Sequence, residues 1–191
     1  MTNYLFKIIM GGNGGVGKTT MLNKYTKGIF VENMIMTIGL DFFVKEWSFN
    51  STHCKLQIWD LGGQERFRFL HECHVNGADV GVLLFDLTSI HSLENIPYWA
   101  NMFRSKNNRL PLILVGTKHD LINENYYPGI QDDVVFEIAE MCEIKKEYYI
   151  KASSKTGYNV NNVFRLVFEL ALQQMHEEKL VYPEFSTSYS L

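Results

Sequence analysis

Several features that would place a chain in a special structural class are missing here. Three cysteines, Cys54, Cys73 and Cys142, are too few and too widely spaced in 191 residues for a disulfide framework, so we expect reduced thiols in a cytoplasmic protein. No apolar run is long enough to cross a bilayer. The formal net charge of −3 gives no electrostatic case for nucleic acid or an anionic membrane as the main partner, so we expect no nucleic acid partner.

The two ends of the sequence also lack familiar signals. The first four residues carry no basic region of a signal peptide, and Thr2 stands where N-myristoylation requires glycine. No cysteine follows Cys142, so we expect no lipid anchor on this chain. Any association with a membrane is therefore expected to be indirect, through a protein partner.

Strand-like and helix-like stretches alternate along almost the whole chain. Six stretches have the pattern of β-strands: 5–10, 40–49, 55–60, 80–86, 112–116 and 148–152. Five have helical periodicity: 20–27, 66–76, 92–106, 131–141 and 160–176. The strands 80–86 and 112–116 are apolar on both faces, as parallel strands covered by helices require. The stretch 40–49 mixes charged and aromatic residues, which is typical of an edge strand in a hairpin with 55–60. The pattern predicts an α/β fold with a doubly wound, mostly parallel six-stranded sheet, one antiparallel edge strand and about five helices.

The most informative motif is Gly12-Asn13-Gly14-Gly15-Val16-Gly17-Lys18-Thr19, which matches G-x-x-x-x-G-K-[ST] between a predicted strand and a predicted helix. Its glycines leave backbone N–H groups free to bind phosphate oxygens, and the N-terminus of the helix that begins at Thr20 favours negative charge. Lys18 can reach the outer phosphates, and the Thr19 hydroxyl can bind Mg²⁺. We expect this phosphate loop to bind a nucleoside triphosphate.

A second polar segment, Asp60-Leu61-Gly62-Gly63-Gln64, follows the end of a buried strand. The Asp60 carboxylate can hold Mg²⁺ through a water molecule, and Gly63 can bring its N–H against a terminal phosphate because it has no Cβ. Gln64 is placed to orient a water molecule for in-line attack. Such a segment also occurs in ordinary turns, but together with the phosphate loop it indicates hydrolysis, with Gln64 and Lys18 as catalytic residues.

A third segment, Thr117-Lys118-His119-Asp120, follows an apolar strand. The Asp120 carboxylate can accept hydrogen bonds from both N1–H and the exocyclic amine of guanine, whereas adenine offers neither. A polar loop after a strand explains this segment equally well when it is taken alone. Ser153-Ser154-Lys155 follows the last predicted strand and can close over the base from the other side, which favours guanine recognition.

These motifs, in this order, resemble the Ras superfamily of small GTPases, most closely its Rab-like branch. The resemblance runs from residue 4 to about 178, and it includes Thr37-Ile38-Gly39 and Trp59-Asp60-Leu61-Gly62-Gly63-Gln64-Glu65-Arg66-Phe67. Part of it is also similar to GTPases of fungal septation and mitotic exit and to some archaeal small GTPases. It implies a P-loop NTPase G domain over 1–178, followed by a tail, 179–191, that we expect to be flexible.

The family resemblance further implies a monomeric GTP/GDP switch that requires Mg²⁺, an exchange factor, a GTPase-activating protein and effectors. Thr37 would bind the metal together with Thr19 and, through water, Asp60, and Phe30 would pack against guanine. Segments 28–40 and 61–76 would be the two switches, ordered by GTP. The full set of expected nucleotide-binding residues is Gly12, Asn13, Gly14, Gly15, Val16, Gly17, Lys18, Thr19, Thr20, Phe30, Thr37, Gly63, Thr117, Lys118, Asp120, Ser153, Ser154 and Lys155.

The sequence departs from the family pattern at several positions. Thr117 stands where Asn is usual, and a hydroxyl cannot replace both arms of an amide, so we expect guanine preference with weaker binding or faster exchange. Gly62 stands where Ala is common, and two successive glycines predict a more mobile second switch. No arginine lies in 29–39, so we expect slow intrinsic hydrolysis that a partner's arginine accelerates.

Two alternatives remain open at this point. A pseudo-GTPase held in one state is opposed by the intact metal-binding and water-orienting residues, but Thr117 keeps it open. A small-molecule kinase would use the same phosphate loop, although it would have no use for Asp120 or for switch-like loops. GTP turnover separates the first alternative from a GTPase, and nucleotide preference separates the second.

Overall fold

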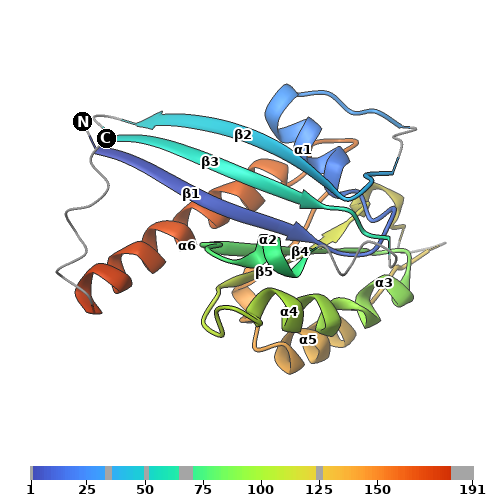
Figure 1. Cartoon of the computed structure of the whole chain (residues 1–191). Helices are drawn as coiled ribbons and strands as arrows, with labels where there is room; N and C mark the ends of the chain where they lie inside the picture. The colour runs from blue at the N-terminus through green and yellow to red at the C-terminus, as the bar shows by residue number, and fades with distance from the viewer. Residues whose placement is uncertain (1, 33–35, 50–51, 65–70, 124–126, 182–191) are drawn as a thin grey trace.

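The structure is a computed structural model that describes residues 2–32, 36–49, 52–64, 71–123 and 127–181 (Figure 1). The two predicted switches, 28–40 and 61–76, are thus described in part, and the predicted tail lies outside the described residues from position 182 onward. Within the described ranges, no helix is both long enough and apolar enough to cross a membrane.

The core of the molecule is a six-stranded sheet in the order β2-β3-β1-β4-β5-β6. Its strands are β1 (Thr2–Gly11), β2 (Leu40–Phe49), β3 (Thr52–Leu61), β4 (Val80–Asp86), β5 (Leu112–Thr117) and β6 (Tyr149–Lys151). The edge strand β2 pairs antiparallel with β3, and every other pair is parallel. All residues of β4 and β5 are buried, as their apolar sequences predict. The predicted doubly wound sheet is therefore confirmed.

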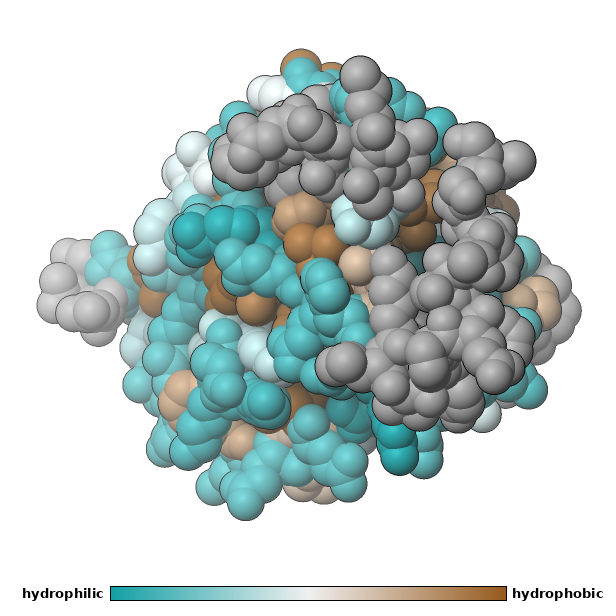
Figure 2. All heavy atoms as spheres, turned by 90° about the vertical axis from the view of Figure 1, so that its left-hand side faces the viewer, coloured by the Kyte–Doolittle hydropathy of each residue, from teal (hydrophilic) through white to brown (hydrophobic). Residues whose placement is uncertain are grey.

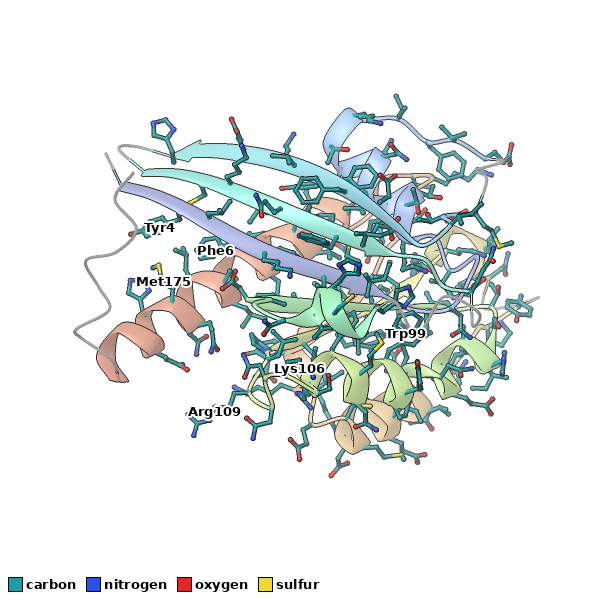
Figure 3. The ribbon with its side chains drawn as sticks, in the orientation of Figure 1. Tyr4, Phe6, Trp99, Lys106, Arg109 and Met175 are labelled. Carbon is teal, nitrogen blue, oxygen red and sulfur yellow. The ribbon has the colours of Figure 1, made fainter. Side chains whose placement is uncertain are left out.

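Helices cover both faces of the sheet (Figure 1). One face packs against α1 (Lys18–Lys27) and α6 (Val160–Val181). The other face packs against α2 (Glu72–Val75), α3 (Ile90–Glu94), α4 (Ile96–Arg104) and α5 (Asp132–Met141). Two short 3-10 helices, His119–Leu121 and Lys146–Tyr148, complete the described elements. Figure 3 shows Tyr4 and Phe6 of β1 on the side of α6. There the ring of Phe6 packs edge-on against that of Phe168, with 6.3 Å between the ring centroids.

Apart from shifts of one or two residues at helix ends, the described helices differ from the predicted ones in three places. The predicted helix 92–106 is interrupted at Asn95 and forms α3 and α4, because Pro97 in the first turn of α4 lacks an N–H and its ring excludes a continuous helix. Of the predicted helix 66–76, residues 65–70 lie outside the described residues, and α2 is the helical part that is described. The last helix continues past the predicted end at 176 and past the predicted domain boundary at 178, to Val181.

The sheet topology brings the chemical motifs to one edge. Because β1, β3, β4, β5 and β6 run parallel, the segments that follow them meet at their carboxyl ends, and β2 begins at that same end, directly after residues 37–39. This is where open α/β sheets bind ligands. The opposite end of the molecule faces the viewer in Figure 2, and hydrophilic residues cover most of its lower half.

Candidate nucleotide-binding site

The loop between β1 and α1 contains glycines at positions where another residue would be strained. Gly12 has a φ of 134°, and a Cβ at this position would lie 2.1 Å from the carbonyl oxygen of Leu84. Gly17, with a φ of 95°, is the N-cap of α1. The loop therefore follows the surface of β4 closely and directs the N-terminus of α1 toward the carboxyl edge of the sheet, in a conformation suited to binding an anion.

The Lys18 side chain lies back along this loop. Its ammonium group donates hydrogen bonds to the carbonyl oxygens of Gly12 at 2.8 Å and Asn13 at 3.0 Å, and the residue is 5% exposed. Burial lowers the pKa of Lys18 to about 8, and the negative charge of the Asp60 carboxylate offsets part of this shift. Burial likewise raises the pKa of Asp60, while the Lys18 ammonium opposes that rise. A bound anion at this place would therefore favour the charged form of Lys18.

Three predicted metal ligands converge beside Lys18. The hydroxyl oxygens of Thr19 and Thr37 lie 2.7 Å apart, and both lie against Asp60: the Thr19 hydroxyl donates to Oδ2, and the Thr37 hydroxyl lies 3.4 Å from the same oxygen. The other carboxylate oxygen of Asp60, Oδ1, is buried and makes no hydrogen bond. Hydroxyl and carboxylate oxygens are the ligands that Mg²⁺ prefers, and a buried oxygen without a partner fits a cation or its bound water. These residues could hold Mg²⁺.

Gly62 and Gly63 join three segments of backbone. A Cβ on Gly63 would lie 2.3 Å from the Asn13 carbonyl carbon and from the Gly14 nitrogen, so Gly63 packs directly on the phosphate loop. The Gly62 N–H donates to the Gly39 carbonyl at 2.8 Å, and a Cβ on Gly62 would lie 2.8 Å from the Thr37 carbonyl oxygen. Gly62 thus has a packing role that the sequence analysis did not foresee. Its predicted effect on the mobility of the second switch stays a prediction.

At the base end, Thr117 and Asp120 are both held by the protein. The buried Thr117 hydroxyl lies 2.7 Å from the Val16 carbonyl oxygen and 2.8 Å from that of Phe85. It therefore braces the phosphate loop. The Ser153 hydroxyl, fully buried, donates to Asp120 Oδ1 at 2.5 Å and leaves Oδ2 of the exposed carboxylate for other donors.

Asp86 is a site residue that the sequence analysis missed. It ends the fully buried strand β4 and is paired in register with Thr117, so that it lies next to Lys118. The Lys118 ammonium and Asp86 Oδ2 are 2.6 Å apart, and the other oxygen, Oδ1, accepts hydrogen bonds from Thr88. The backbone of Lys118 is in the left-handed region, with a φ of 59°. The sequence signal that could have revealed Asp86 is an acidic residue at the end of an otherwise apolar strand. That strand lies beside β5, which Lys118 directly follows.

These segments surround a cavity of about 430 Å³. The predicted residues that line it are Gly14, Gly15, Val16, Gly17, Lys18, Thr19, Thr20, Phe30, Thr37, Gly63, Gln64, Thr117, Lys118, Asp120, Ser154 and Lys155. Gly12, Asn13, Asp60 and Ser153 stand outside this lining, although each contacts a residue that belongs to it. Val31, Glu32, Met36 and Leu121 line the cavity and were not predicted, because nothing in their own residue types points to a ligand.

A further missed contact reaches the phosphate loop from α4. The indole N–H of Trp99, which is fully buried, donates to Asn13 Oδ1 at 3.3 Å, and Figure 3 shows Trp99 directed from α4 toward the end of β1. The ring of His71 stacks on the indole at 5.7 Å between centroids. His71 is buried, whereas Cys73, two residues later, is exposed. No group of metal-ligating side chains forms around them within the described residues.

A doubly wound sheet, a glycine-rich loop of the G-x-x-x-x-G-K-[ST] pattern before its first helix, and a cluster of hydroxyl and carboxylate oxygens at the same edge are the features of the P-loop class of nucleotide-binding domains. Comparison with known proteins identifies the family. Residues 7–173 match the Ras family. The chain is 34% identical over 172 residues to Ras-related protein Rab-19 of Xenopus laevis, covering 86% of this chain and 76% of that protein. It is 34% identical over 163 residues to human Ras-related protein Rab-30, with coverages of 85% and 77%. To Ras-related protein Rab7 of Pisum sativum it is 35% identical over 188 residues, with coverages of 94% and 88%. The chain belongs to the Ras family and is a Rab-like small GTPase.

Proposed function

We propose that this protein is a molecular switch that binds GTP or GDP together with Mg²⁺ and slowly hydrolyses GTP to GDP and phosphate. The observation that carries the proposal is the convergence of Lys18, Thr19, Thr37 and Asp60 at one end of the cavity, with Asp60 Oδ1 left without a hydrogen bond. A cationic side chain beside three potential metal ligands is suited to a phosphate group and its counter-ion.

Each residue has a defined task in this scheme. The amides of residues 14–19 and the Lys18 ammonium bind phosphate oxygens, and Lys18 exchanges its present carbonyl partners for them. Thr19, Thr37 and, through water, Asp60 hold Mg²⁺, which when bound neutralises charge on the phosphates. Gln64 orients the attacking water, and the Gly63 N–H faces the terminal phosphate.

Base selection rests on Asp120 in this proposal. Its carboxylate is oriented by Ser153 and accepts two hydrogen bonds from guanine, whereas adenine would leave it without donors. Phe30, Lys118, Ser154 and Lys155 line the same cavity as Asp120, and in this proposal they flank the base and ribose. We therefore expect guanine nucleotides to be preferred over adenine nucleotides.

The slow rate and the partners follow from the first switch. Residues 29–39 contain no arginine, so this loop brings no cationic side chain of that kind to the developing charge, and an activating protein that supplies one would accelerate hydrolysis by about 10³–10⁵. An exchange factor and effectors would each distinguish the GTP-bound form of the protein from the GDP-bound form. The three cysteines, all of them among the described residues, form no disulfide, which supports the reducing cytoplasm as the proposed location.

The first experiment is to denature the purified protein and to identify the released nucleotide by chromatography, together with the Mg²⁺ content. We expect GDP or GTP near one per chain. Hydrolysis of added GTP is then followed with and without Gln64→Leu, which should retain binding and lose turnover. Bound ATP would favour a kinase, binding of GTP without any turnover would favour a pseudo-GTPase, and an unchanged rate in Gln64→Leu would overturn the role of Gln64.

A further inference from the structure

Met36 occupies an unusual position for an apolar side chain. It immediately precedes Thr37, lines the same cavity, and is 55% exposed. Its sulfur lies 3.9 Å from the amide nitrogen of Gln64, within the range of an N–H···S hydrogen bond. The thioether therefore joins the loop before β2 to the segment after β3, at the residue to which hydrolysis is assigned.

The phosphate loop itself leaves room for this contact. Gly14 has no side chain, and a Cβ built on it would lie 3.6 Å from the Met36 sulfur, in ordinary van der Waals contact. Met36 thus covers the space above Gly14, and Gln64 lies against Met36 on the cavity side. The phosphate-binding amides begin at this same point of the loop.

We propose that Met36 is a positioning residue for Gln64: its thioether holds the Gln64 amide over Gly14, at the phosphate end of the cavity. This inference rests on the proposed GTP hydrolysis. An unbranched thioether suits the task because it combines apolar cover with a weak acceptor and adapts to an irregular gap. Holding Gln64 there reduces the conformational freedom that must be lost when the attacking water is oriented.

The test compares three substitutions at position 36 in single-turnover hydrolysis of GTP bound beforehand. Met36→Leu keeps the apolar cover and removes the acceptor, and we expect hydrolysis to be about threefold to tenfold slower. Met36→Ala should be at least as slow. Met36→Gln supplies an oxygen acceptor on a chain of similar length, and it should restore the rate to within about twofold of the wild type. GDP affinity should change by less than about twofold in Met36→Leu, because leucine keeps an apolar side chain in the cavity lining.

The matched control is Met141→Leu, the same exchange at a 72% exposed residue on α5 that lies outside the cavity lining, and it should hydrolyse GTP at the wild-type rate. The proposal is overturned if Met36→Leu and Met36→Ala keep the wild-type rate, or if Met36→Gln is as slow as Met36→Leu. It is equally overturned if the loss of rate follows a loss of GDP affinity. A wild-type protein that binds GTP without hydrolysing it would instead overturn the proposed function on which this inference rests.

Discussion

The Thr117 hydroxyl on β5 lies 2.7 Å from the carbonyl oxygen of Val16, so one small side chain ties the base end of the site to the phosphate loop. The same hydroxyl is 2.8 Å from the Phe85 carbonyl oxygen on β4. A hydroxyl has a single hydrogen to donate, and two carbonyl oxygens already compete for it. The bracing role of this position is therefore present in the structure, and no donor remains to bind a base.

Substitution of Thr117 should affect nucleotide release in opposite directions. Thr117→Val keeps the shape and removes the one donor that two buried carbonyl oxygens share, so we expect about 1–3 kcal/mol less stability and faster GDP release. Thr117→Asn offers two N–H groups and should slow the release several-fold. Release of a fluorescent GDP analogue and thermal unfolding measure both effects. Equal release rates for wild type and Thr117→Asn would refute the expected weakness of Thr117.

Nucleotide affinity should depend on pH through Lys18. Burial lowers its pKa to about 8 in the nucleotide-free protein, and bound phosphate favours the charged form, so that binding takes up a proton when Lys18 is neutral. GDP affinity should be greatest below pH 8 and fall as the pH rises through 8, by up to about tenfold per pH unit. The matched variant Lys18→Met should bind more weakly and lose this slope. A dissociation constant that stays level from pH 7 to pH 9.5 in the wild type would contradict the prediction.

The fold could be predicted because its signals are local. Apolar runs and helical periodicity gave the six strands and their order along the chain, and the glycine and charge pattern gave the residues at the carboxyl edge. The break between α3 and α4 could have been found from Pro97. The contacts of Met36 with Gln64 and of Trp99 with Asn13 could not be predicted from the sequence. They join residues that lie 28 and 86 positions apart, and nothing in the types of these residues indicates that they meet.

Gly62 gives a case where two physical effects predict opposite results. If its only effect is backbone freedom, Gly62→Ala should order the second switch and leave hydrolysis equal or faster. The structure places a Cβ at this position 2.8 Å from the Thr37 carbonyl oxygen, so we expect Gly62→Ala to displace Thr37 and to weaken Mg²⁺ binding and hydrolysis.

The comparison variant is Gly63→Ala, whose Cβ would lie 2.3 Å from backbone atoms of the phosphate loop and should be more damaging still. Mg²⁺ titration of GTP hydrolysis, measured for wild type and both variants, ranks the three proteins. A Gly62→Ala protein with wild-type Mg²⁺ dependence and faster hydrolysis would favour the mobility explanation over the packing one.

Trp99 should stabilise the phosphate loop through its N–H group rather than through its bulk alone. Trp99→Phe keeps an aromatic ring beside His71 and Phe103 but removes the donor to Asn13 Oδ1, so we expect a loss of about 1 kcal/mol in stability and GDP release a few-fold faster. Asn13→Ala removes the acceptor and should have a similar effect.

If the hydrogen bond is responsible, the double variant Trp99→Phe with Asn13→Ala should be no worse than the more severe single variant. Tyr98→Phe, a change at the 41% exposed neighbour, is the control and should leave release unchanged. Additive losses in the double variant would instead assign the effect of Trp99→Phe to lost packing volume.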